Sequence, residues 1–408
     1  MRPARARFLV SLALLLAAPL AAQDLAVRGR VVHTQAGARI EDGVVLVRDG
    51  KIAAVGKRGE VTLPDGITTL EAAVVTPGLI DAHCSLGLAG MLNYAHDRDE
   101  LERSSAVQPE LRALDAYNPR EPLIEWVRGL GVTTIHTGHA PGAVISGQTL
   151  IAKTHGDTVD EAVIRPLAMV AATLGAGAVS ESDKAQPGTR AKAAALLREE
   201  LVKTQSWMEK RARLLAESKP IERDLRREVL ARVLEGEVPL LVTAQRAQDI
   251  ATALRLAREF GFRLVLDGAA EGYLMLDELV AAKVPVLVHP TMFRAVGETE
   301  NLSLETPGVL RRAGLQVALQ GGYEAYVPRT RVVLFEAAEA AAYGLSFDDA
   351  LALVTIDAAR LLGIADRVGS LEVGKDGDLA LYDGDPFEYT THCVGVVIEG
   401  RVVSRETR

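Results

Sequence analysis

The segment VTPGLIDAHCSLG at residues 75–87 decides the fold of this chain. It is mostly apolar on both faces, as buried parallel strands are, and it turns polar at His83, Cys84 and Ser85. Parallel β/α folds place their functional groups at the carboxyl ends of such strands. The segment therefore predicts a buried strand over residues 76–83 and makes His83 the first candidate site residue.

Similar apolar runs alternate with amphipathic helical patterns along the next 280 or so residues, which indicates a parallel α/β architecture. The predicted strands span residues 76–83, 132–137, 167–172, 238–243, 263–267, 284–289 and 315–320. The predicted helices span residues 247–260, 274–282, 331–343 and 347–362. An eighth strand is expected within residues 173–237.

The two ends of the chain share a different texture, short strands separated by turns. The Asp49-Gly50 pair between two β-branched runs is a strong hairpin signal. Neither end alone buries enough surface to be stable, so residues 24–74 and 367–408 are expected to form one small composite β-sandwich. Residues 75–366 then form the α/β domain.

Residues 1–22 have the pattern of a secretory signal peptide. Arg2, Arg5 and Arg7 precede an apolar run at residues 8–22, which is short for a membrane span of about 20 residues. We expect cleavage after Ala22 and an exported protein in the periplasm.

Composition narrows the partners. The 408 residues carry a net charge of −8, and nucleic-acid binding needs a basic face, so we expect no nucleic-acid partner. Residues 190–236 are rich in Arg, Lys and Glu and predict long solvated helices, with a partner-binding or membrane-surface role left open. The two cysteines, Cys84 and Cys393, are expected to be isolated thiols, although export would permit a disulfide.

Three segments resemble imidazolonepropionase-like members of the amidohydrolase superfamily. They are VTPGLIDAH at 75–83, RAQDIATALRLAREFGFRLVLDGAAEGY at 246–273 and RVGSLEVGKDGDLALYDGDP at 367–386. The resemblance implies a (β/α)8 TIM-like barrel with a β-sandwich built from both termini. It also implies hydrolysis of C–N bonds in cyclic amides or dipeptides by a metal-bound water, since zinc lowers the pKa of bound water to about 7.

The metal ligands that the resemblance implies are mostly replaced. The first histidine is His83, but its His-x-His partner is Ser85, and the later positions fall on Thr243, Gly268 and Gly321 or Gly322. Such side chains do not offset the dehydration of a divalent cation. We therefore expect no cofactor, no assignable catalytic residue and a role as a non-catalytic binding module. An inactive subunit beside a ligand-complete amidohydrolase homologue is equally consistent, and an oligomer is expected.

An alternative stays open, in which other strand-end histidines rebuild the site. His83, His136, His139 and His289 would then hold zinc or another divalent metal in an active C–N hydrolase. For either reading, the pocket for a small amide or peptide ligand is expected to include three further side chains, Asp267, Glu271 and Tyr323.

Overall fold

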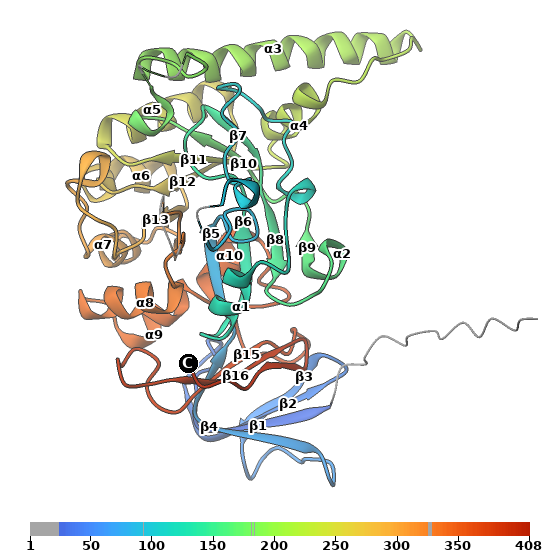
Figure 1. Ribbon diagram of the computed structural model, residues 1–408, viewed down its shortest axis with the longest axis vertical. Helices are drawn as coiled ribbons and strands as arrows, with labels where there is room; N and C mark the ends of the chain where they lie inside the picture. The colour runs from blue at the N-terminus through green and yellow to red at the C-terminus, as the bar shows by residue number, and fades with distance from the viewer. Residues whose placement is uncertain (1–23, 93, 181, 183, 325–328) are drawn as a thin grey trace, which may run out of the picture.

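The computed structural model describes residues 24–92, 94–180, 182, 184–324 and 329–408 (Figure 1). The expected signal peptide lies outside these residues. Cys84 and Cys393 are buried free thiols. In the described part of the chain, no helix combines the length and apolarity needed to cross a membrane.

Seven parallel strands form most of a barrel, and all seven lie where the sequence predicts them. The first two of these strands pair with each other, and the last five pair one after the next in parallel. They are β5 (Leu79–Cys84), β6 (Val132–Thr137), β10 (Val170–Thr173), β11 (Leu240–Ala244), β12 (Leu264–Gly268), β13 (Val286–Val288) and β14 (Val317–Leu319). The Gly322 amide donates to the His83 carbonyl at 3.0 Å, which joins the end of β14 to β5.

The eighth position differs from the prediction. Beyond Thr173, the last residue of β10, the described residues up to 237 contain no strand; their α-helices are α3 (Arg190–Ala216) and α4 (Leu225–Leu234). The place between β6 and β10 is taken by β7 (Ile145–Gln148) and β8 (Leu150–Lys153), which pair antiparallel with β10 and β6. The expectation was wrong because the charge-rich stretch forms long helices, and α3 extends across one end of the molecule in Figure 1.

The remaining helices cover the barrel. They are α1 (Pro122–Arg128), α2 (Val159–Ala162), α5 (Ala247–Phe260), α6 (Leu276–Ala282), α7 (Thr306–Arg312), α8 (Val333–Ala342), α9 (Phe347–Leu353) and α10 (Ile356–Leu362). Short 3-10 helices lie at Ala95–Asp97, Ala113–Asp115, Ala176–Ala178, Gly272–Met275 and Gly297–Thr299. The single helix predicted over 347–362 is two helices, because the Val354 carbonyl accepts from the Ile80 amide of β5 at 2.7 Å and interrupts the helical ladder.

Strands from both chain ends form one seven-stranded sheet, in agreement with the composite β-domain expected from the sequence. Its order is β17-β16-β15-β4-β1-β2-β3. The strands are β1 (Leu25–Val32), β2 (Ile40–Arg48), β3 (Lys51–Lys57), β4 (Thr68–Pro77), β15 (Leu379–Tyr382), β16 (Cys393–Ile398) and β17 (Arg401–Ser404). The short strand β9 (Val163–Arg165) is not part of this sheet and pairs with β8. Asp49 and Gly50 both have positive φ, 49° and 78°, as the hairpin turn between β2 and β3 requires.

A buried ion cluster ties the barrel to this sheet. Lys153, at the end of β8, donates to Asp376 at 3.0 Å and to Asp378 at 2.5 Å, just before β15. Asp376 also contacts Lys51 at 2.5 Å and Arg367 at 2.9 Å. The Lys153, Asp376 and Asp378 side chains are 2%, 1% and 4% exposed, so this contact is inside the protein.

Side-chain alternation along the strands explains how the barrel presents a site. Leu241, Val265 and Ala318 point into the apolar barrel interior. Because successive side chains alternate across a strand, the residues two positions later face the same way. These residues are Thr243, Asp267 and Gln320, at the carboxyl ends of β11, β12 and β14.

Candidate functional site

A cavity of about 210 Å³ lies at the carboxyl ends of the barrel strands. Its polar lining comes mainly from strand ends: His83 lies near the end of β5 and Ser85 just after it, and Thr243, Asp267 and Gln320 lie at the carboxyl ends of three other strands. Its apolar wall comes from loop residues, namely Ala140, Pro141, Leu174, Pro290 and Phe293. The cavity is large enough for a small molecule but not for a folded segment.

The Asp267 carboxylate is the centre of the site. It accepts hydrogen bonds from His83 Nδ1 at 3.1 Å, from Thr243 Oγ1 at 2.5 Å and from Gln320 Nε2 at 2.7 Å. Asp267 is 2% exposed, so these donors replace the water that a carboxylate needs. Gln320 is itself held by the Leu287 carbonyl at 3.1 Å, which fixes the direction of its amide.

Electrostatics favour the charged form of this pair. Burial opposes ionisation of Asp267, but His83, Thr243 and Gln320 outweigh it and lower the Asp267 pKa. Burial likewise opposes protonation of His83, but the Asp267 charge outweighs it and raises the His83 pKa. The two shifts favour an imidazolium–carboxylate pair, and an imidazolium has no nitrogen lone pair for a metal.

Two polar atoms of the site stay available to a ligand. The Nδ1 atom of His83 bonds to Asp267, and its Nε2 atom forms no hydrogen bond with the described residues. Ser85 Oγ is buried without a hydrogen-bond partner in the same part of the chain. A buried hydroxyl without a partner costs free energy, so its position at the cavity indicates a ligand contact.

The other three predicted histidines do not join His83 in a metal site. His136 uses both ring nitrogens, with the Ala82 carbonyl and the Thr149 hydroxyl each at 2.7 Å. Burial and the His83 charge lower its pKa to about 3. Burial also lowers the pKa of His139, to about 4, and that of His289, whose Nδ1 donates to the Pro290 carbonyl.

No group of three or more His, Cys, Asp or Glu side chains is arranged to hold a metal ion in the described ranges. The four histidines are therefore not gathered into such a group among the described residues, and the rebuilt metal centre stays a prediction. The physical reason is that His136 lies inside the barrel wall, bonded to strand and loop groups on both sides.

Of the three predicted pocket residues, Asp267 and Tyr323 line the cavity and Glu271 does not. The Glu271 carboxylate accepts from the Ala247 amide at the first residue of α5 and from Asn301, both at 2.7 Å. It stabilises a helix start, which is where a helix dipole favours anions. The Tyr323 hydroxyl donates to Glu100 at 2.9 Å, which fixes the ring at the cavity edge.

Gln320 and Phe293 are site residues that the sequence reasoning missed. Gln320 could have been found, because it lies two positions after the inward-facing Ala318. Phe293 lies in a loop after β13 and carries no sequence signal that distinguishes it from a core residue.

Two buried acids lie behind the site. The Asp81 carboxylate accepts from the Gly321 amide at 2.8 Å and from the His83 amide at 3.2 Å. Burial raises the pKa of Asp81 and that of Glu336 each to about 7. A Cβ on Gly321 would lie 2.4 Å from Asp81 Oδ2, so no side chain fits at that position while Asp81 stays in place.

Comparisons with known proteins agree with the observed fold. The amidohydrolase family model matches residues 340–404. An imidazolonepropionase of Caulobacter sp. (strain K31) is 25% identical over 361 residues, 84% of this chain and 88% of the relative. The amidohydrolase tasK of Hapsidospora irregularis is 25% identical over 88% of this chain, which spans only 39% of that protein.

Among solved structures, an amidohydrolase from Thermotoga maritima MSB8 is 31% identical with a TM-score of 0.87, covering 94% of this chain and 100% of its own. A putative prolidase from Bifidobacterium longum, 18% identical over 94% of this chain and 95% of its own, has a TM-score of 0.58 and shares the fold.

Proposed function

This chain belongs to the amidohydrolase superfamily, where it is similar to imidazolonepropionases, and from that premise we propose that it binds a small amide or peptide without hydrolysing it. The observation that carries the proposal is the Asp267 carboxylate, which accepts hydrogen bonds from His83, Thr243 and Gln320. A carboxylate and an imidazolium that neutralise each other supply neither the charge nor the lone pair that a divalent metal needs.

The chemistry of the cavity favours a ligand with a carbonyl oxygen. The raised pKa of His83 favours the imidazolium, which offers a donor at Nε2, and the Ser85 hydroxyl has no partner among the described residues. The Asp267 charge already balances the imidazolium, so an uncharged acceptor fits better than an anion. Phe293 and Leu174 give the apolar contact that a small cyclic amide or the side chain of a dipeptide would make.

The test uses 2-pyrrolidinone, a five-membered cyclic amide, and the full chain. We expect saturable binding of 2-pyrrolidinone in an NMR titration, no formation of 4-aminobutyrate, and metal content far below one ion per chain. Ser85→Ala should weaken binding several-fold, whereas Ser206→Ala, an exposed serine on α3, should leave it unchanged. Stoichiometric zinc or iron, or steady release of 4-aminobutyrate, would overturn the proposal.

The second candidate is C–N bond hydrolysis, which the likeness to imidazolonepropionases favours. The described residues do not support its form with a rebuilt histidine metal site. Hydrolysis that continues in the presence of chelator and disappears in His83→Asn would establish it in a metal-free form.

Three further proposals rest on sequence alone. Residues 1–22 direct export, which N-terminal sequencing of the purified mature protein would test, with a retained Met1 contradicting it. The chain forms an oligomer and pairs with a ligand-complete homologue. Light scattering of the chain alone, and affinity purification with quantification of amidohydrolase homologues, test these two in turn.

A further inference from the structure

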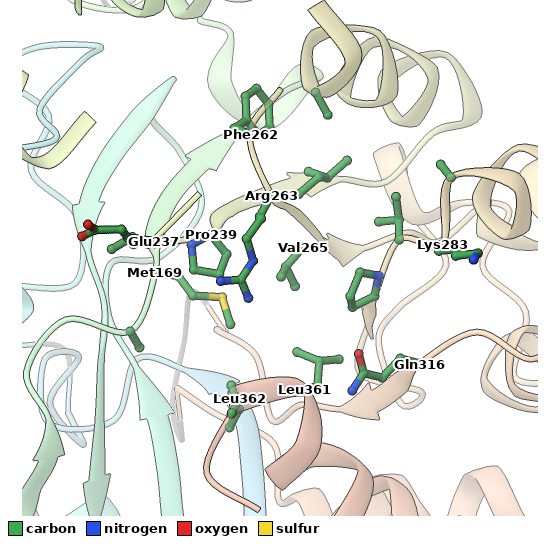
Figure 2. Close-up of a pocket in the computed structure, with 18 of the residues that line it drawn as sticks. Met169, Glu237, Pro239, Phe262, Arg263, Val265, Lys283, Gln316, Leu361 and Leu362 are labelled. Carbon is green, nitrogen blue, oxygen red and sulfur yellow. The ribbon is translucent and has the colours of Figure 1, made fainter. Parts of the chain in front are cut away.

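A second and larger cavity lies at the opposite end of the barrel. It measures about 930 Å³ and is lined by residues at the amino ends of β10 to β14 and at the carboxyl ends of the surrounding helices. Figure 2 shows this cavity, with the Arg263 side chain pointing into it. Its size lies within the range of small-molecule sites, about 300–1,000 Å³.

The floor of this cavity is apolar. Met169, Val265 and Leu362 line it and are 3%, 4% and 2% exposed, and the half-buried Leu361 lies beside them in Figure 2. These side chains belong to the apolar cluster that fills the barrel interior. A ligand that enters the cavity would therefore meet hydrocarbon at its deep end.

The rim is strongly basic. Six lining residues are cations and one is an acid: Arg165, Arg232, Arg258, Arg263, Lys283 and Arg360, with Glu237. Two cations have carboxylate partners, Arg232 with Glu237 at 3.0 Å and Arg360 with Asp357 at 3.1 Å.

The other four cations have no ion pair recorded anywhere in the described residues. Arg165 donates only to the Leu362 and Gly363 carbonyls, each at 2.7 Å. Arg263 donates only to the Gly236 carbonyl at 3.2 Å. The side chains of Arg258 and Lys283, which also line the cavity, form no hydrogen bond with the described residues.

Helix ends explain part of this charge but not all of it. Helices α4, α5, α6 and α10 end at this face, and each carboxyl end carries about −0.5 charge. Together they offset about two of the four unpaired cations. A net positive charge therefore remains above an apolar floor. Such a cavity favours a ligand that has both an anionic group and an apolar part over a neutral ligand or a polyanion without an apolar part.

We propose that this cavity binds an amphipathic carboxylate, with its head at Arg263 and its hydrocarbon part on Met169, Val265 and Leu362. The site is separate from the strand-end cavity, and it does not depend on the function proposed for that cavity. Charge complementarity selects the anionic head, and burial of apolar surface selects the hydrocarbon chain.

Isothermal titration calorimetry of the full chain with decanoate tests the proposal. We expect one decanoate bound per chain, at least tenfold weaker binding of decanol, and no comparable binding of inorganic phosphate. Arg263→Met should weaken decanoate binding about tenfold, and Lys283→Gln, which removes a charge on another side of the rim, should weaken it less. Arg255→Met is the matched control, because Arg255 is an exposed arginine of α5 outside the cavity.

Four results would overturn the proposal. They are the absence of saturable decanoate binding, equal binding of decanol, equal binding of phosphate, and an affinity unchanged by both cavity variants. Phe293→Ala, in the strand-end cavity, should leave the decanoate affinity unchanged. A loss of binding in that variant would locate decanoate in the other cavity and would likewise overturn the proposal.

Discussion

Replacing Lys153 by Met should destabilise the protein far more than removing a surface lysine. The Lys153 ammonium contacts Asp376 at 3.0 Å and Asp378 at 2.5 Å, and all three side chains are at most 4% exposed. After the change, Asp376 keeps Lys51 and Arg367. Asp378 keeps only the Glu399 amide, at 2.9 Å, so it becomes a buried charge without a cation.

Removing one partner of a buried ion pair typically costs 3–5 kcal/mol, so we expect a loss of about 3–5 kcal/mol in the free energy of unfolding at pH 7. Asp378→Asn added to Lys153→Met should recover part of the loss, because it removes the unpaired charge. Lys203→Met is the matched control: Lys203 contacts Glu199 at the same 2.5 Å, but both side chains are 50% exposed, so no resolvable change is expected.

Urea unfolding followed by circular dichroism measures these differences, and pH supplies a second check. Burial opposes ionisation of Asp376, but the cations Lys153, Lys51 and Arg367 outweigh burial and lower the Asp376 pKa. The contribution of Asp376 to stability is therefore present above its unfolded-state pKa and is lost as pH falls through its folded-state pKa. The difference in unfolding free energy between wild type and variant should therefore narrow once the pH falls below the ordinary aspartate pKa of about 3.9. A loss below about 1 kcal/mol, or a gap that widens in acid, would refute the reasoning.

Three further predictions concern the barrel. Burial raises the pKa of Glu336 to about 7, so its contribution to stability is present below its unfolded-state pKa and is lost as pH rises through 7. Glu336→Gln should therefore be more stable than wild type in alkali, by up to about 3 kcal/mol at pH 9. Equal pH dependence of the two proteins in thermal unfolding would contradict this. Asp267→Asn should lower the His83 pKa in an NMR titration, and an unchanged pKa would show that the pair is not ionic. Gly78→Ala would place a Cβ 2.2 Å from Thr133 Oγ1 and should cost about 1–3 kcal/mol in urea unfolding, whereas Gly37→Ala, with open space around it, should be neutral; equal effects would refute the steric argument.

The sequence predicts the barrel strands well because buried parallel strands are short, apolar and bounded by turns. It fails at the eighth position, where the glycine-rich run at residues 142–148 reads as a turn but contains β7. Gly147 lies inside that strand because a Cβ there would lie 2.5 Å from the His139 ring and 2.8 Å from the Leu111 carbonyl. A glycine required by a close approach looks the same in a sequence as a glycine in a turn.

The site shows the same division. Asp267 could be placed at a strand end from its sequence alone, and the structure puts it at the centre of the cavity. Its partners Thr243 and Gln320 come from other strands, so their joint contact depends on strand register, which local patterns do not give. Glu271 was misjudged because a carboxylate that caps a helix and one that faces a ligand have the same local sequence signal.

The composite sheet has a consequence for how the chain reaches its folded state. Pro77 of β4 pairs with Leu379 of β15, so the sheet joins segments roughly 300 residues apart. Closing a flexible loop of that length costs on the order of 5 kcal/mol in chain entropy. That cost falls if the intervening barrel is already compact, which favours an order of events in which the barrel forms first. The N-terminal strands are made first, and the edge of β4 stays unpaired until β15 is made. An unpaired strand edge promotes aggregation, so this interval is a hazard during synthesis.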